Sequence, residues 1–175
     1  MKKLIICRGI QGSGKSTWAR QWVNEDPEHR IRINNDDIRN MLGPYWVPKR
    51  EFMVDHIRYS SIKEAMKHGI SIVVDNMNLN PKECKVLANL VRVFNSTIRD
   101  KSIAHPDWAQ EEYEIELQDF RTPLEECISR DATRENPIGE KVITSTYERY
   151  KVFYEDLDYC KELVSTVRPL ADSND

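Results

Sequence analysis

Short apolar stretches alternate with longer stretches of helical periodicity along most of the chain. The apolar stretches predict four strands and a short closing one, at Leu4–Cys7, Arg30–Ile33, Ile70–Val74, Tyr113–Leu117 and Ser165–Arg168. The third stretch is almost entirely apolar, which is typical of a central parallel strand covered on both faces. Regular alternation of strand and helix predicts an α/β fold, a three-layer sandwich with a parallel five-stranded sheet.

The segments between these strands carry apolar side chains at helical spacing, and several begin with capping residues. Polar side chains and early carboxylates at positions 34–37 predict one helix start. Asn80-Pro81-Lys82-Glu83 and Thr122-Pro123-Leu124-Glu125 each combine a cap residue, a proline in the first turn and a carboxylate three residues after the cap. A last long helix is expected over about Glu140–Leu157.

One stretch shows neither the strand pattern nor the helix pattern. Residues 95–110 show no clear periodicity and are too long for a typical connection between a helix and a strand. We expect an insertion there, with a helical turn near Trp108.

Length, charge and cysteine content exclude several classes of protein. A chain of 175 residues, 31% charged and 39% apolar, is expected to form a single domain over residues 1–175. Its net charge of -3 argues against a broad footprint on duplex nucleic acid, although it leaves room for a local basic pocket. The four scattered cysteines and the lack of a membrane-length apolar run or signal-peptide pattern predict a cytoplasmic protein with reduced thiols and no membrane partner.

Gly9-Ile10-Gln11-Gly12-Ser13-Gly14-Lys15-Ser16-Thr17 fits the phosphate-binding loop pattern without insertion or deletion. It joins the first strand to a helix, so backbone N–H groups at the helix start can surround a triphosphate. The cofactor-binding residues expected here are Gly12, Ser13, Gly14, Lys15, Ser16 and Thr17. Lys15 would lie over the β- and γ-phosphates of ATP, and the Ser16 hydroxyl would hold Mg²⁺. The fold is therefore expected to be P-loop kinase-like.

Polar residues follow the second and third strands at the sheet edge where a ligand is expected. Asp36 and Arg39 share one face of a helix start, which would bring a proton acceptor and a phosphate-binding cation into the cleft together. The alternative is that residues 34–37 only cap a helix, and capping is expected to explain one of the two aspartates there. Asp75 is expected to act on magnesium through water or to orient a partner, the alternative being a strand-end residue paired with a loop N–H.

Arg130 and Arg134 lie four residues apart on one helical face, just before Asn136-Pro137-Ile138-Gly139 breaks the helix. Such a pair can close over a triphosphate as a helical lid and neutralise charge in the transition state. The alternative is a solvated charged face with partners at positions 126, 131 and 135.

Taken together, these residues resemble the 5′-kinase domain of the phage-type polynucleotide kinases. The matching blocks are Gly9–Arg20, Asn34–Arg39, Asp75–Pro81 and the Arg130/Arg134 pair, and they span the chain from residue 1 to about 157. The family transfers the γ-phosphate of ATP, with magnesium, to 5′-hydroxyl ends of DNA or RNA. Its Asp-x-Asp-Gly-Thr phosphatase signature does not occur in this sequence, so phosphate removal is not expected.

The resemblance also implies roles for individual residues. Asp36 would be the general base and Arg39 would contact the substrate phosphate. Lys15 and Arg134 would contact the transferring phosphoryl group, and Ser16 would contact the metal. Two other functions remain open: a kinase of a small metabolite or sugar, and a nucleotide-binding switch that hydrolyses ATP only to change partners.

Overall fold

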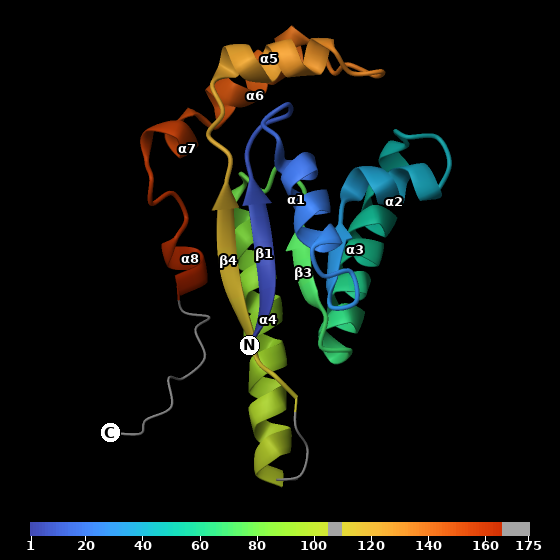
Figure 1. Cartoon of the computed structure of the whole chain (residues 1–175), viewed down its shortest axis with the longest axis vertical. Helices are drawn as coiled ribbons and strands as arrows, with labels where there is room; N and C mark the ends of the chain where they lie inside the picture. Colours follow the sequence, from blue (N-terminus) through green and yellow to red (C-terminus); the bar gives the residue numbers. More distant parts are fainter. Residues whose placement is uncertain (105–109, 166–175) are drawn as a thin grey trace.

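The computed structural model describes residues 1–104 and 110–165. A parallel sheet in the order β2-β3-β1-β4 forms its centre (Figure 1). The strands are β1 (Lys2–Arg8), β2 (Arg30–Ile33), β3 (Ser71–Val74) and β4 (Tyr113–Asp119). All four lie where the apolar stretches predict them. The expected five-stranded sheet is corrected to four strands within the described residues, because Ser165 ends a short helix, α8 (Glu162–Ser165), and residues 166–168 lie outside that part of the chain.

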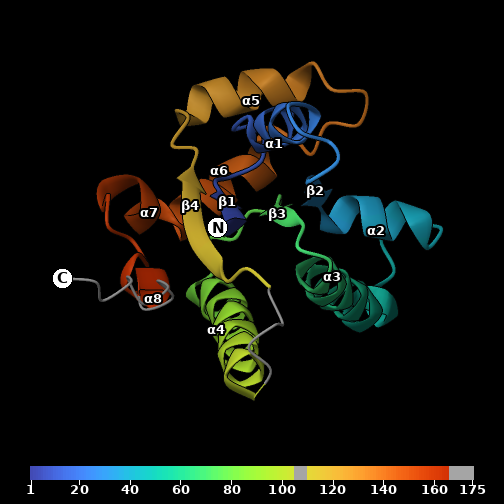
Figure 2. The same cartoon turned by 60° about the horizontal axis from the view of Figure 1, so that its bottom comes forward.

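Each face of the sheet is covered by helices because successive side chains of a strand point to opposite faces. Leu4 and Ile6 of β1 pack with α3 (Glu51–Lys67) and α4 (Pro81–Ala104) in one core. Ile5 and Cys7 pack on the other face with α1 (Lys15–Asn24). Figure 2 shows α3 and α4 on one side of the strands and α1 on the other. This arrangement is the expected three-layer sandwich.

Above the carboxyl ends of the strands lie α5 (Leu124–Ala132) and α6 (Glu140–Arg149), over a small core centred on Ile10 and Leu79 (Figure 1). The remaining elements are α2 (Asn35–Met41), the short 3-10 helix η1 (Pro48–Arg50) and α7 (Lys151–Glu155). In Figure 1, α2 lies beside the carboxyl end of the sheet, next to α3. The sheet therefore presents its carboxyl edge to a space bordered by α2 on one side and α5 and α6 above.

The single long helix expected over 140–157 is wrong, because the chain breaks between α6 and α7 at Tyr150, where φ is -113° and ψ is 27°. After the break, the Phe153 ring lies 5.4 Å from the guanidinium of Arg8, a fully buried side chain of β1. Arg8 also donates two hydrogen bonds to Asp119 and one to the carbonyl of Tyr159. These contacts hold the C-terminal segment against the sheet, in a geometry that a continuous helix would not provide.

The insertion expected at 95–110 is also corrected, because α4 continues through residue 104. Asn95 is buried in that helix, and its side-chain amide bonds both backbone groups of Tyr113, with Nδ2 2.8 Å from the carbonyl oxygen and Oδ1 2.9 Å from the amide nitrogen. A buried polar residue in this position interrupts the apolar period and hides the helix from pattern analysis. Trp108 lies outside the described residues. Within residues 1–104 and 110–165, no helix has the length and apolar character that crossing a bilayer requires.

Candidate active site

The phosphate-binding loop turns tightly between β1 and α1, and its glycines are required by geometry. Gly12 has a φ of +76°, and a Cβ there would lie 2.4 Å from the carbonyl oxygen of Cys127 on α5. Gly14 is the N-cap of α1 with a φ of +97°, and no side chain caps this helix start. The first amides of α1 thus have neither an intrahelical partner nor a capping side chain, which is the arrangement that binds phosphate.

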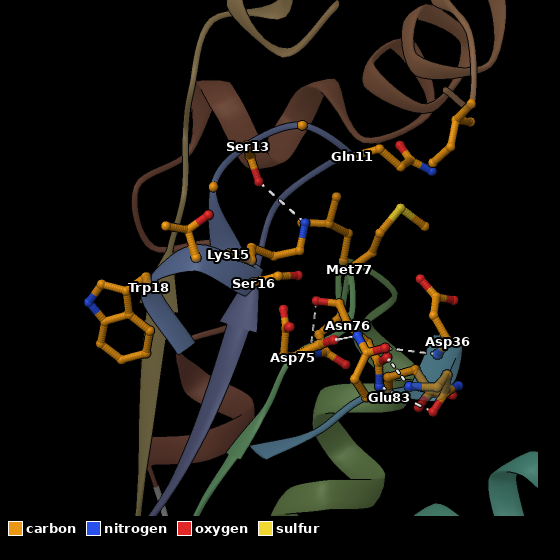
Figure 3. A pocket seen from close by; sticks show the side chains of 18 of the residues that line it. Gln11, Ser13, Lys15, Ser16, Trp18, Asp36, Asp75, Asn76, Met77 and Glu83 are labelled. Atoms are coloured by element: carbon orange, nitrogen blue, oxygen red, sulfur yellow. Dashed lines mark hydrogen bonds between the residues drawn. The ribbon is translucent and has the colours of Figure 1, made fainter. Parts of the chain in front are cut away.

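Lys15 is buried and folded back onto the loop that precedes it (Figure 3). Its Nζ atom donates to the carbonyl oxygens of Gly9 at 2.8 Å and Ile10 at 2.7 Å, and lies 3.3 Å from Ser13 Oγ. Burial lowers the pKa of Lys15 to about 8, although the nearby carboxylate of Asp75 opposes the shift. The two carbonyl oxygens and the nearby Asp75 carboxylate therefore stabilise the buried ammonium group.

Asp75 follows β3 and is 1% exposed. Arg32 of β2 donates from Nε to Asp75 Oδ2 at 2.6 Å, whereas Asp75 Oδ1 is buried without a hydrogen-bond partner among the described residues. In Figure 3 the Asp75 carboxylate points toward Ser16. The alternative of a strand-end carboxylate paired with a loop N–H is therefore wrong, since the partner is a guanidinium.

These residues fit a magnesium ion. Mg²⁺ in phosphate-transfer sites is bound by one or two protein oxygens, with water and phosphate completing the octahedron. The orphaned oxygen of Asp75 and the hydroxyl of Ser16 are oxygens of this kind. Consistent with so few protein ligands, the described residues contain no group of three or more His, Cys, Asp or Glu able to hold a metal ion by themselves.

The start of α2 resolves the question of its two aspartates. The side-chain oxygen of Asn34 caps the helix, accepting from the amides of Asp36 at 2.9 Å and Asp37 at 3.1 Å. Neither aspartate side chain is the cap, but both lie in the first turn of α2, where the helix dipole favours carboxylates, and Asp37 also forms an ion pair with Arg32. The Asp36 side chain is 55% exposed and faces the cavity from α2, on the far side of Met77 from the loop (Figure 3).

Asp36 is held from two directions. Its Oδ1 atom accepts from Arg39 Nη1 at 2.7 Å and from the Tyr45 hydroxyl at 2.9 Å. Arg39 in turn donates to Glu51 through Nε at 3.0 Å and Nη2 at 2.7 Å. Each of the three guanidinium nitrogens of Arg39 thus donates a hydrogen bond to a carboxylate. Arg39 could contact a substrate phosphate only if one of these hydrogen bonds broke.

Arg130 and Arg134, the pair expected to form a lid, lie on α5 and just after it, and both line the same cavity as the phosphate-binding loop. Arg130 Nη1 lies 3.5 Å from the carbonyl oxygen of Gly12, and the same side chain pairs with Glu126. Arg134 Nη1 lies 3.6 Å from Asp131. Both arginine side chains are about half exposed, so they can reach a ligand while retaining acidic neighbours on their own segment.

One cavity of about 870 Å³ brings these groups together at the carboxyl edge of the sheet. Its lining includes every site residue that the sequence predicts: Gly12, Ser13, Gly14, Lys15, Ser16, Thr17, Asp36, Arg39, Asp75, Arg130 and Arg134. The phosphate-binding loop, the carboxylate of α2, Asp75 and the two arginines at positions 130 and 134 therefore face a common space, although they come from four separate parts of the chain.

The cavity also contains residues that sequence analysis missed. Arg58 of α3 is 3% exposed, lines the cavity and donates from Nη2 to Glu83 at 2.9 Å. Tyr45 lines it from the loop after α2. Arg32 lies behind Asp75. Arg32 alternates with Arg30 on a strand whose other two residues are isoleucines, so the pattern does not single it out. Nothing local distinguishes Arg58 from the other charged residues of α3.

Fold and site define a P-loop protein with the α/β architecture of kinases. Residues 4–157 match the family model described as an AAA domain (AAA_33), and the chain belongs to that family.

Known proteins similar to this chain extend the comparison. The L-seryl-tRNA(Sec) kinase of Methanococcus maripaludis is 24% identical over 150 residues, covering 84% of this chain and 52% of that protein. An uncharacterized protein of Pasteurella multocida is 30% identical over 102 residues, covering 50% of this chain and 57% of its own length. The chain thus spans about half the length of these relatives.

Among solved structures, a chain of the Pnkp1/Rnl/Hen1 RNA repair complex superposes with a TM-score of 0.65. The sequences are 22% identical, and the match covers 90% of this chain and 47% of that chain. At this identity, the superposition shows that the two share the fold.

Proposed function

We propose that this protein is an ATP-dependent polynucleotide kinase, which transfers the γ-phosphate of ATP to the 5′-hydroxyl end of a DNA or RNA strand. The observation that carries the proposal is the shared cavity, which Lys15, Ser16, Asp36 and Arg134 all line. In Figure 3, Met77 lies between Asp36 and the pair Lys15 and Ser16. A hydroxyl acceptor needs a base on the side of the γ-phosphate away from the leaving group. Asp36 supplies a carboxylate across the cavity from the phosphate-binding loop.

The chemistry follows from these positions. The 5′-hydroxyl donates its proton to the free carboxylate oxygen of Asp36 while its oxygen forms a bond to the γ-phosphorus. The bond between that phosphorus and the β,γ-bridging oxygen breaks, and ADP leaves with the electron pair. Lys15 and Arg134 stabilise charge on the transferring phosphoryl group, a form of catalysis that acts chiefly through positioning and electrostatics. Magnesium held by Ser16 and, directly or through water, by Asp75 would neutralise phosphate charge.

Two similarities support a nucleic-acid acceptor over a free metabolite. A relative matched over most of this chain is named as a kinase acting on a charged tRNA. The RNA repair complex supplies a chain with the same fold. Together with the family resemblance of the Asp36/Arg39 block, they favour a hydroxyl carried on a polynucleotide.

The decisive experiment supplies γ-labelled ATP and magnesium with a 5′-hydroxyl single strand of RNA or DNA. Wild type should label the strand, Lys15→Ala should not, and Asp36→Asn should lower kcat by about 10² to 10⁴-fold, the usual contribution of a general base. Asp37→Asn is the matched control: this neighbouring aspartate is similarly exposed and pairs with Arg32. Its kcat should stay within a few-fold of wild type.

Three further outcomes would overturn the proposal. Full label transfer by Asp36→Asn would remove the general base. Transfer to gluconate or free nucleosides, with none to oligonucleotides, would indicate a metabolite kinase. ATP hydrolysis unaffected by Asp36→Asn and by any acceptor would indicate a nucleotide-dependent switch.

A further inference from the structure

Two adjacent exposed aromatic side chains lie near the acceptor end of the cavity: Tyr45 lines it, and Trp46 follows in the chain and contacts the same guanidinium group, that of Arg39. Tyr45 is 50% exposed and Trp46 is 60% exposed, in the loop between α2 and η1. Adjacent exposed aromatic side chains form an apolar patch, and such a patch marks a binding surface more often than a single exposed ring does. The pair is next to the proposed general base, since the Tyr45 hydroxyl donates to Asp36 at 2.9 Å.

Both rings are held by one guanidinium group. The Arg39 guanidinium carbon lies 5.7 Å from the centroid of the Tyr45 ring and 5.5 Å from that of Trp46. Arg39 is itself fixed by three hydrogen bonds to Asp36 and Glu51. The rings therefore rest on a cation whose position is set by the same carboxylate that would receive the acceptor proton.

Charge at this end of the cavity disfavours recognition through phosphates. The carboxylates of Asp36, Glu51, Asp55 and Glu83 outnumber the guanidinium groups of Arg39 and Arg58 with which they pair. A polynucleotide end placed here gains little from phosphate contacts, because the cations are already neutralised. Its affinity must come mainly from another part of the nucleotide.

We propose that Tyr45 and Trp46 form a stacking platform for the terminal base of the acceptor strand. This inference rests on the proposed function and names how its substrate is recognised. The base and the 5′-hydroxyl belong to the same nucleoside, so a base stacked on these rings lies only a few bonds from the hydroxyl at Asp36. Stacking on aromatic side chains tolerates any base, because every base has a π-face.

The test compares two 5′-hydroxyl oligonucleotides that differ only in their first residue, adenosine in one and an abasic sugar in the other. Trp46→Ala and Tyr45→Ala should each raise the KM of the adenosine-ended strand about tenfold, as expected for loss of one stacked ring. The KM of the abasic strand should already be high and should change little. The KM for ATP should be unchanged in Trp46→Ala.

Matched variants separate stacking from structural damage. Phe52→Ala removes an aromatic side chain that is 73% exposed on the neighbouring helix α3, and it should leave every constant unchanged. Trp46→Phe should restore most of the affinity for the adenosine-ended strand. Tyr45→Phe keeps the ring but loses the bond to Asp36, so it should affect kcat more than KM.

The outcomes distinguish this inference from the proposed function. If wild type labels both strands and the platform variants behave like Phe52→Ala, the platform is overturned and the kinase activity stands. Equal increases in KM for both strands would also overturn it, since the abasic strand has no first base to stack. If wild type labels neither strand, the proposed function fails and the platform fails with it.

Discussion

Arg32 Nε lies 2.6 Å from Asp75 Oδ2, while Asp75 Oδ1 has no hydrogen-bond partner among the described residues. The guanidinium therefore engages one carboxylate oxygen and leaves the other free, while the carboxylate as a whole points toward Ser16 (Figure 3). This arrangement pairs a buried carboxylate with a cation and leaves one of its oxygens without a hydrogen bond, which suits contact with magnesium or its water.

The first prediction concerns the stability of this pair. Arg32→Met should destabilise the protein by about 3–5 kcal/mol, because it leaves the buried Asp75 charge uncompensated. Adding Asp75→Asn should recover much of the loss by removing that charge. Urea unfolding measures both effects. Arg30→Met serves as the control. It removes ion pairs with Glu25 and Asp26 and contacts with Trp22, but it leaves no buried charge without a partner. An equal loss in it would contradict the prediction.

The second prediction concerns how Lys15 couples nucleotide binding to pH. Burial lowers the pKa of the free protein's Lys15 to about 8, and neighbouring phosphates should raise it again. Binding then takes up a proton above pH 8, so affinity for MgATP should be nearly constant below pH 7 and fall up to about tenfold per unit above pH 8. Calorimetry in buffers of different ionisation enthalpy measures the proton uptake.

The lowered pKa of Lys15 also affects the free energy of unfolding, which should change with pH in the opposite direction to the affinity for MgATP. Between pH 8 and the ordinary lysine value of 10.5, the unfolded chain holds a proton at Lys15 that the folded chain has released. Stability contributed by this group should therefore rise with pH across that window. Lys15→Met should remove both the proton uptake and this rise. Proton uptake that persisted in Lys15→Met would assign it to another group.

Local patterns predicted the strands and the phosphate-binding loop because their signals are contained within a few residues. The features that these patterns failed to predict depend on contacts between residues far apart in the sequence. The signature at Thr122 predicts a helix cap, yet its hydroxyl donates to the carbonyl oxygen of Ser13 at 2.9 Å and α5 begins without a side-chain cap. The signature at Asn80 is confirmed, since its side chain accepts from the amide of Lys82.

The same distinction applies to the candidate site. Motif spacing predicted Lys15, Asp36 and Asp75, and all three line one cavity. It could not predict that Arg39 is engaged by Glu51, twelve residues further along, because that pair depends on how α2 packs against α3. Residues whose partners are set by tertiary packing cannot be assigned from spacing alone.

The third prediction separates two reasons why a glycine is required. Gly139 has a φ of +98°, and a Cβ at this position would have no heavy atom of the described residues within 4 Å. Gly139→Ala should therefore cost only the backbone strain of about 1–2 kcal/mol. Gly12→Ala adds a clash at 2.4 Å with the Cys127 carbonyl. It should cost more and weaken MgATP binding, because the loop or α5 must move. Thermal melting and nucleotide titration check both variants, and equal losses would refute the steric argument.

The fourth prediction concerns the lid arginines and depends on the proposed function. Arg134→Ala should lower kcat by about 10³-fold or more, while MgATP binding in the absence of acceptor weakens far less, since the charge it neutralises develops in the transition state. Arg130→Ala should act in the same direction. Arg149→Ala, an exposed arginine at the end of α6, is the control and should keep normal kcat. A normal kcat in Arg134→Ala would favour the solvated charged face instead.

The last prediction concerns Glu51, which pairs with Arg39 at 2.7 Å and neutralises it. The amide of Glu51→Gln can still accept a hydrogen bond, but the change removes one unit of negative charge beside the cavity and leaves Asp36 as the carboxylate partner of Arg39. The KM for a 5′-hydroxyl oligonucleotide should therefore fall, and its dependence on salt should steepen by about one phosphate contact. Glu64→Gln on the same helix pairs only with exposed Lys67 and His68 and should change neither quantity. A higher KM in Glu51→Gln, with unchanged salt dependence, would mean that Glu51 serves only to position Arg39 and Asp36.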